Sequence, residues 1–370
     1  MKKYVLAASL LTASLTTIQA QFNHSSGTDA LRNNTTGIHN TSMGHHSLRG
    51  NTRGSFNTAF GASALRMNTE GQSNTVMGYQ SLYRNTSGKE NTSIGANAMN
   101  TNSVGNYNTS VGTFSLAFSR SGNHNTAMGH RALMSNTTGN SNIGIGGYSL
   151  QSNEDGDYNT ALGYYALYTN TKGKNNTAIG NKSFSGGFSY SNSTALGANS
   201  AISADNQVRL GDTEVSSIGG RVGWTTVSDG RFKTNVQSNV PGLNFINQLR
   251  PVTYLVDNKS IRQHLNLDTN AVTNTATLQS GFIAQEVAQT ANALGYSFSG
   301  VDAPKNEQDY YGLRYAEFTV PLVQAVQELS AENEVLKAKV AQLEQQNEEM
   351  QQLKAEVAAI KELLNTNAAR

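Results

Sequence analysis

The sequence contains no cysteine and only four prolines among its 370 residues, and charged side chains are scarce. Without cysteine, the chain forms no disulfide, uses no thiol chemistry and carries no lipid on a cysteine. Charged residues make up 14% of the chain and the formal net charge is +2, so no basic face typical of nucleic-acid binding is present. We therefore expect no nucleic-acid partner.

Recurring metal-ligand spacings are also missing. The histidines fall at variable positions, and acidic residues of the first 200 positions gather at only one place, Glu154, Asp155 and Asp157. A lone acidic turn is typical of a solvated loop, whereas a glycosidase needs two carboxylates at a defined separation. We expect neither a metal site nor a cofactor.

One apolar run stands out, and it lies at the N-terminus. Met1, Lys2 and Lys3 precede an apolar stretch from Tyr4 to Ile18, and Ala20 offers a small residue for cleavage. This pattern predicts a signal peptide over residues 1–20, although a buried N-terminal helix is the alternative. The run is too short to span a membrane, so we expect a secreted or cell-surface protein without a transmembrane segment in the mature chain.

A repeat of 17 residues fills the first half of the mature chain. The string Asn-Thr-x-apolar-Gly begins at Asn40, Asn57, Asn74, Asn91, Asn108, Asn125, Asn159 and Asn176. Variant forms at Asn23, Asn142 and Ser193 complete eleven units without an insertion. An unbroken period of this kind predicts one stacked architecture over residues 21–206.

Each unit contains two short apolar segments and little else to bury. Thr58 and Phe60 are two residues apart and share a strand face, and Ala64-Leu65 marks a second segment that we expect to be a second strand. One unit cannot offset its own ordering entropy, but stacked units cover each other. The pattern predicts a parallel β-solenoid, or β-roll, and a mainly β protein.

The repeat resembles the head repeats of trimeric autotransporter adhesins, which stack in three-chain bundles. The resemblance implies a homotrimer whose chains pack side by side. The Asn and Thr residues are expected to form ladders and turns, and a carbohydrate-binding face on a host surface is the alternative.

The repeat ends at Gln207, and residues 207–227 are predicted to be a neck. Val208, Leu210, Val215, Ile218 and Val222 indicate a few short strands there. The run SDGRFKTNV that follows, residues 228–236, resembles the start of the S74 peptidase domain, the C-terminal intramolecular chaperone of phage endosialidases and tail fibres. The resemblance implies a catalytic dyad of Ser228 and Lys233 with Asp229 and Arg231 in support, and cleavage after Val227.

Three later stretches carry the same resemblance. They are LRPVTYLVD (249–257), GFIAQEVAQ (281–289) and YYGLRYAEFTVPLVQAVQEL (310–329). The resemblance extends over about residues 208–330 and implies a small α+β chaperone domain at 228–320, with Phe232 and a polar insertion at 258–279 as departures.

The residue types by themselves allow self-cleavage. Ser228 can attack the carbonyl of Val227 through its hydroxyl, and the resulting ester is then hydrolysed. A lysine acts as the base only when neutral, which requires desolvation. Five residues of separation place the two side chains apart on a regular strand or helix, so either a turn at Asp229-Gly230 or a second chain has to bring them together. The residue types alone also fit an exposed charged turn that is never cut.

A heptad pattern closes the sequence. Its positions are Val326, Leu329, Asn333, Leu336, Val340, Leu343, Asn347 and Met350, followed after a three-residue step by Leu353, Val357, Ile360 and Leu364. It predicts a coiled coil over residues 321–370 with a stammer. Val or Asn at a with Leu at d favours two strands, whereas the resemblance implies three.

Together these features predict a secreted or cell-surface trimeric fibre, adhesin-like, with a self-cleaving chaperone. The alternatives are an uncleaved adhesin with a permanent coiled-coil stalk and a glycan-binding spike.

Overall fold

The computed structural model describes residues 22–186, 189–269 and 278–368. The predicted signal peptide therefore lies outside the described residues. The chain forms two compact units. One contains the described residues up to Arg221 together with 257–269 and 305–309, and the other contains 222–256, 278–304 and 310–368.

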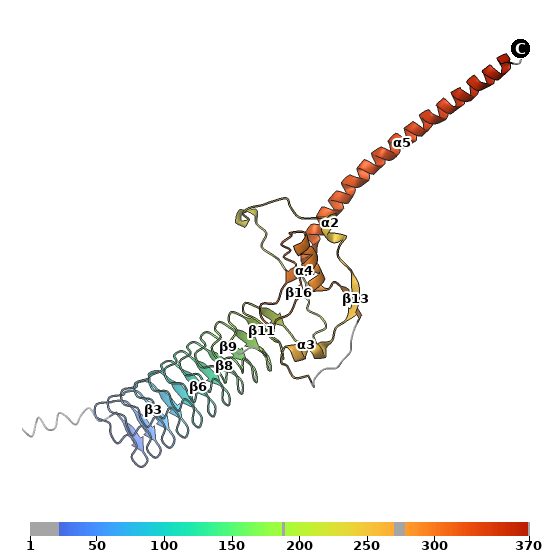
Figure 1. Cartoon of the computed structure of the whole chain (residues 1–370). Coiled ribbons are helices and arrows are strands. Elements are labelled where there is room, and N and C mark those ends of the chain that lie inside the picture. Colours follow the sequence, from blue (N-terminus) through green and yellow to red (C-terminus); the bar gives the residue numbers. More distant parts are fainter. Residues whose placement is uncertain (1–21, 187–188, 270–277, 369–370) are drawn as a thin grey trace, which may run out of the picture. The chain divides into compact units, whose positions relative to one another are not determined.

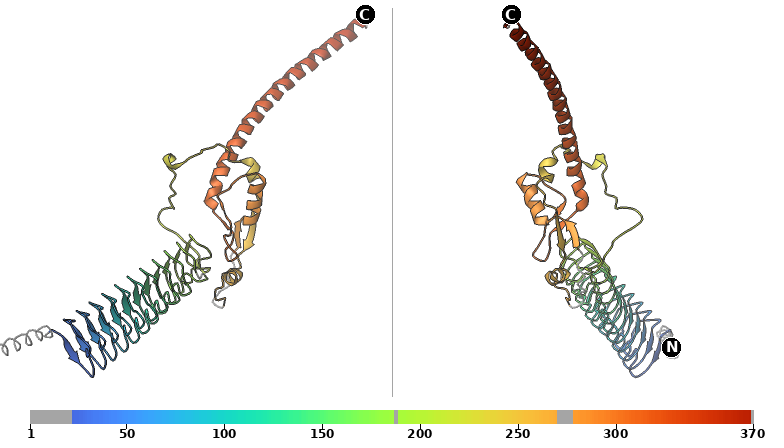
Figure 2. Two further views of the ribbon diagram at one scale, coloured as in Figure 1. Left: turned by 60° about the vertical axis from the view of Figure 1, so that its left-hand side comes forward. Right: turned by 90° about the vertical axis from the view of Figure 1, so that its right-hand side faces the viewer.

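The first unit is a parallel β-solenoid, which confirms the predicted fold class. Its twelve strands are β1 (His24–Ser26), β2 (Thr41–Met43), β3 (Thr58–Phe60), β4 (Thr75–Met77), β5 (Thr92–Ile94), β6 (Thr109–Val111), β7 (Thr126–Met128), β8 (Ile143–Ile145), β9 (Thr160–Leu162), β10 (Thr177–Ile179), β11 (Thr194–Leu196) and β12 (Val208–Leu210). They pair in sequence order, so the coils stack in a single row (Figures 1 and 2). Every step is 17 residues except the last, from Thr194 to Val208, which is 14.

The expected second strand of each unit is wrong. The segment that contains Ala64 and Leu65 is a turn, and Leu65 has a positive φ of 51°. Both side chains are fully buried, whereas a solenoid strand with one face inside the coil would direct only one of two consecutive side chains inward. The chain curls instead, and the same turn recurs in successive coils.

Two ladders of asparagine run inside the solenoid. In the ladder that begins each repeat, Asn125 donates to the carbonyl of Gly139 at 2.9 Å, and its carbonyl oxygen accepts from the backbone N–H of Asn142 at 2.9 Å. In the second ladder, Asn68 donates to Asn51 Oδ1 at 2.7 Å. These amides are fully buried and satisfy backbone groups that the turns leave unpaired. The repeated Asn is therefore structural.

The glycine that ends each strand is required by its conformation. Gly61 has a φ of 129°, and a Cβ there would lie 2.6 Å from the carbonyl oxygen of Gly78 in the next coil. A side chain would both strain the backbone and push the coils apart. This explains the invariant last position of the repeat string.

Two segments from beyond residue 227 complete the C-terminal end of the solenoid unit. Helix α3 (Asn258–His264) carries Arg262, which is 97% buried, lies 3.5 Å from Asp212 and donates to the carbonyl of Asp268 at 2.7 Å. Asp309 is buried and accepts from Ser203 Oγ at 2.7 Å and from Gln207 Nε2 at 3.3 Å. We call these two segments, 257–269 and 305–309, the end cap.

The second unit is small and mixed α and β, as predicted. Its elements are η2 (Gly230–Phe232), α2 (Leu243–Ile246), β13 (Val252–Leu255), β14 (Leu278–Gly281), α4 (Ala284–Ala293), β15 (Val301–Asp302), β16 (Gly312–Leu313), η3 (Tyr315–Phe318) and α5 (Thr319–Ala368). Its core consists of Phe245, Val287, Ala291, Phe298 and Phe318. The few short strands expected between Val208 and Val222 reduce to β12, since residues 213–222 pair with no strand in the described part of the chain.

Helix α5 is a single helix of 50 residues, and Pro321 lies in its first turn, where a missing N–H costs nothing. Its heptad positions are exposed: Val326 by 65%, Leu343 by 62% and Leu364 by 63%. The long helix is confirmed, while its pairing into a coiled coil stays a prediction because a single chain is described.

Candidate active site

The residues that follow the predicted cut form one tight turn. Asp229 caps η2 and accepts from the backbone N–H of Arg231 at 2.9 Å. The guanidinium of Arg231 folds back on the same carboxylate, with Nη2 2.6 Å from Oδ2. These side-chain and backbone hydrogen bonds from Arg231 hold the pKa of the Asp229 carboxyl below its usual range. Asp229 and Arg231 therefore shape the turn.

This turn brings Ser228 and Lys233 together within one chain. Lys233 Nζ donates to Ser228 Oγ at 2.8 Å, across the five-residue separation that a strand or helix would not bridge. Of the two routes that the sequence allows, the turn at Asp229-Gly230 is the one present in this chain. The contact joins a nucleophile and a base of the Ser-Lys type.

The site is open to solvent in the single chain. Ser228 and Lys233 are exposed, and the side chain of Val227 is 81% exposed. A Cβ placed on Gly230 would meet no atom within 4 Å. The residues before the site, 216–227, form no main-chain hydrogen bond in the described part of the chain. None of the described residues therefore covers the peptide bond between Val227 and Ser228.

The other stretches of the predicted resemblance converge in one small unit. LRPVTYLVD contains β13, GFIAQEVAQ contains the end of β14 and most of α4, and YYGLRYAEF leads through β16 and η3 into α5. Arg250 pairs with Glu286, with 3.1 Å between Nε and Oε2, and the rings of Phe282 and Phe318 stack at 5.3 Å. Segments far apart in sequence thus share one core.

A comparison with known protein families identifies a match in this region. Residues 228–296 match the Peptidase S74 family, described as the chaperone of endosialidase. The match begins at Ser228, the first residue of the turn, and includes β13, β14 and α4. The predicted resemblance is thereby confirmed over these residues. No curated protein matches the chain.

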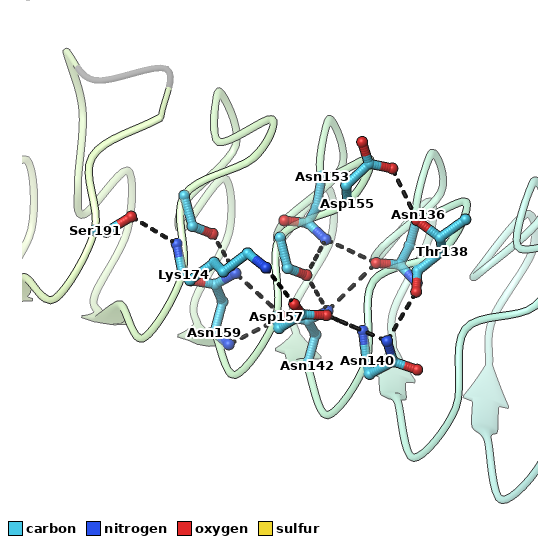
Figure 3. A network of polar contacts seen from close by, with 12 residues as sticks. Asn136, Thr138, Asn140, Asn142, Asn153, Asp155, Asp157, Asn159, Lys174 and Ser191 are labelled. Carbon is cyan, nitrogen blue, oxygen red and sulfur yellow. Dashed lines mark hydrogen bonds and ion pairs between the residues drawn. The ribbon is translucent and has the colours of Figure 1, made fainter.

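The aspartates of the acidic turn in the solenoid make structural contacts with neighbouring coils (Figure 3). Asp157 takes the place of an asparagine in an outer ladder, accepts from the backbone N–H of Asn140 at 2.9 Å and pairs with Lys174 at 2.7 Å. Asp155 accepts from Thr138 Oγ1 at 2.8 Å. Each of these two carboxylates has a local partner, as expected for a loop in the repeat.

Two buried charged residues of the end cap, Arg262 and Asp309, escaped prediction from the sequence. Arg262 lies in the segment interpreted as a polar insertion, and Asp309 precedes the last stretch of the resemblance. Neither has a motif around it, and the sequence pattern gives no sign that either charged side chain is buried. Within the described residues, no helix combines the length and apolar character needed to cross a bilayer.

Proposed function

We propose that this chain is a fibre-forming protein whose C-terminal region assists assembly and then cuts itself off between Val227 and Ser228. The contact of 2.8 Å between Lys233 Nζ and Ser228 Oγ carries this proposal. The S74 match supports it, because that family is associated with autoproteolytic cleavage.

The reaction needs no external reagent except water. Lys233 in its neutral form takes the hydroxyl proton of Ser228, and Oγ attacks the carbonyl carbon of Val227. The C–N bond between Val227 and Ser228 breaks, the amine of Ser228 receives the proton, and an ester joins the two residues. Water then hydrolyses the ester, leaving a carboxylate on Val227 and a free amine and hydroxyl on Ser228.

Lysine has to lose its proton first, and removal from water favours the neutral form. Because Ser228 and Lys233 are exposed in the single chain, the proposal requires that assembly covers them. Cleavage then follows assembly and does not precede it. The turn supplies the geometry, and neighbouring chains supply the burial.

The chaperone role is supported by the end cap. Arg262 and Asp309 come from the C-terminal side of the cut but pack on the last coils through Asp212, Ser203 and Gln207. A solenoid coil without a neighbour exposes its core. An end that is already covered therefore favours folding of the adjoining coils. We propose that the end cap holds the last coils in place while slow, nonlocal stacking proceeds.

Self-association into a homotrimer is supported by apolar side chains that a single chain leaves exposed. The third residue of successive strands forms an outward stripe, in which the most exposed members are Met43, Met77, Ile94, Met128, Leu162 and Ile179. The heptad positions of α5 form a second exposed seam. Association of copies along both surfaces removes this apolar area from water. The mass of the native protein in solution tests this, and the mass of a single chain contradicts it.

The cleavage is tested on a denaturing gel with the full chain expressed for export. The wild type is expected to give two fragments, the larger ending at Val227, whereas Ser228→Ala and Lys233→Ala stay intact. Thr225→Ala, three residues before Ser228 in the same exposed segment, is the matched control and is expected to be cut. Fragmentation of both dyad variants would refute the mechanism.

We further propose that the protein is exported through residues 1–20 and is secreted or held at the cell surface, where it acts as an adhesin-like fibre. Mass and N-terminal sequence of the recovered protein test this, since export predicts a chain that begins at Gln21. A continuous chain through residue 370 would favour the rival candidate, an uncleaved adhesin with a permanent stalk.

A second candidate, carbohydrate binding, is favoured by one hollow on the solenoid. It has a volume of about 630 Å³, and its lining includes Tyr107, Gln72, Lys89, Asn106 and the ion pair of Arg53 with Glu70. An exposed aromatic ring beside amides and charges suits a sugar ring. Saturation-transfer NMR with neutral oligosaccharides should give signals that Tyr107→Ala removes. Tyr158→Ala, an exposed aromatic outside the hollow, should retain them.

A further inference from the structure

The segment before the cut is apolar and unpartnered. We call residues 216–227 the linker. Trp224 is the only tryptophan in the chain and its side chain is 90% exposed, with Val222 82% and Val227 81% exposed. Val222, Trp224, Thr225, Thr226 and Val227 are residue types enriched in strands, yet the linker forms no main-chain hydrogen bond within the described residues. Exposed apolar side chains of this kind favour burial against another surface.

An aromatic hollow lies in the same compact unit. It has a volume of about 380 Å³ and is lined by Tyr254, Phe282, Tyr310, Tyr311, Leu313 and Tyr315 among others. Gly281 makes room for one wall, because a Cβ there would lie 2.2 Å from the hydroxyl of Tyr315. That hydroxyl accepts from the backbone N–H of Phe282 at 3.2 Å, which fixes the ring. The hollow thus has aromatic walls and hydroxyl groups that can bond an indole N–H.

No described residue of the single chain fills the hollow. Trp224 and the hollow belong to one compact unit, yet the indole remains almost fully exposed in that unit. Helix α5 of the same unit presents an exposed heptad seam, which in a parallel assembly places equivalent parts of each copy at the same level. Each copy in such an assembly has neighbours that carry the same exposed linker. A second copy of this chain is therefore the occupant that the observations favour.

We propose that Trp224 of one copy inserts into the aromatic hollow of a neighbouring copy. This inference rests on the proposed assembly and adds the contact that couples it to cleavage. Trp224 is four residues before Ser228, so a linker fixed at Trp224 covers the peptide bond after Val227 and the side chain of Lys233. Docking of the indole supplies the burial that a lysine base needs.

The single tryptophan gives a direct readout. Full-length Ser228→Ala protein, which stays uncut, is examined by tryptophan fluorescence and acrylamide quenching. In the assembled protein we expect a blue-shifted emission and quenching several-fold weaker than after denaturation. Tyr311→Ala should shift the emission to the red, whereas Tyr79→Ala, an exposed tyrosine on the solenoid, should leave it unchanged. Water-like emission from the assembled protein would overturn the inference.

A disulfide cross-link tests the contact directly and does not depend on the Tyr311→Ala variant, which removes part of the wall of the hollow. The chain has no cysteine, so Trp224→Cys combined with Tyr311→Cys in the uncut Ser228→Ala protein introduces the only two thiols. Oxidation should join separate chains on a non-reducing gel, and each single variant serves as the control. Cross-links confined to one chain, or none, would contradict docking between copies.

The outcomes separate this inference from the proposed function. If native mass shows an assembly and the wild type is cut but Trp224 stays in water, only the docking is wrong. If the native mass is that of one chain, the proposed assembly fails and the docking fails with it.

Discussion

The solenoid coils and the residues after Gly211 differ in how completely one chain satisfies its own side chains. Inside the coils, Leu133 and Asn125 are fully buried, and the amide of Asn125 has partners in adjacent coils. In the linker and along α5, Trp224 and Leu343 are 90% and 62% exposed. The interior of the coils is complete in one chain, whereas the linker and the heptad seam leave their apolar side chains in water. We therefore expect the coil repeat to determine a fold within one chain, and the linker and the seam to take part in the association proposed above.

The largest expected effect comes from removing the same apolar side chain in each region. Leu133→Ala should lower the free energy of unfolding by about 2–5 kcal/mol, because the cavity lies between stacked coils. Leu343→Ala should change little in a dissociated chain but weaken the assembly. Denaturant unfolding followed by circular dichroism at several protein concentrations measures both. A concentration-dependent loss for Leu133→Ala and none for Leu343→Ala would reverse the comparison.

The next effect distinguishes the buried asparagine ladder from the outer one. Asn125→Ala leaves the carbonyl of Gly139 and the N–H of Asn142 without their partners, at about 1–3 kcal/mol each. Asn123 is half-buried and makes similar contacts on the outside, with Asn106 N–H 2.9 Å from its Oδ1. Water can replace that amide, so Asn123→Ala should cost less than about 1 kcal/mol. Equal losses of stability for the two variants in thermal unfolding would show that burial does not determine how much a ladder stabilises the fold.

The solenoid could be predicted from the sequence because its period is unbroken. The string from Asn40 to Gly44 recurs every 17 residues, and its glycine and asparagine each have one structural reason. The second segment is a turn and not the expected strand, and the adjacent apolar pair Ala64-Leu65 fits a turn that directs both side chains into the coil. The alternation of side chains between two faces, which identifies a strand, does not describe this segment.

The turn at the cut could be anticipated, but the end cap of the solenoid could not. The five-residue separation of Ser228 and Lys233 implied that a bend was needed if they belong to one chain, and the bend is present. The end cap has no such signal, since Arg262 and Asp309 lie about 50 and 100 positions from their partners Asp212 and Ser203. Long-range contacts of single polar residues leave no periodic trace in one sequence.

A gain in stability should follow where the second asparagine ladder is interrupted. Ser119 occupies a ladder position, and neither its hydroxyl nor Asn102 Oδ1 has a hydrogen-bond partner among the described residues. Ser119→Asn should restore the contact that Asn68 makes with Asn51 and stabilise the coil by about 0.5–1.5 kcal/mol. Ser121→Asn, two residues away and less buried, is the control and should be neutral. A lower melting temperature for Ser119→Asn would mean that the coil has no room for the amide.

The smallest effect is a change in acid sensitivity at Asp157. Burial raises the pKa of this carboxyl, but hydrogen bonds from Lys174 and Asn140 outweigh burial and hold the pKa below its usual range. A carboxyl with a lowered pKa in the folded state stabilises the fold above its unfolded pKa of about 4, and the contribution is lost as the pH falls through the folded value.

Asp157→Asn should therefore flatten the fall in melting temperature below about pH 4 while keeping the ladder. An asparagine oxygen can accept the 2.9 Å hydrogen bond from the N–H of Asn140 that Asp157 accepts now. Lys174→Met should flatten the same fall only in part, because the hydrogen bonds from Asn140 remain. An unchanged acid slope in Asp157→Asn would mean that the pair with Lys174 contributes nothing to stability. The outer ladder would then belong, like the linker, to the part of the molecule that one chain leaves to solvent.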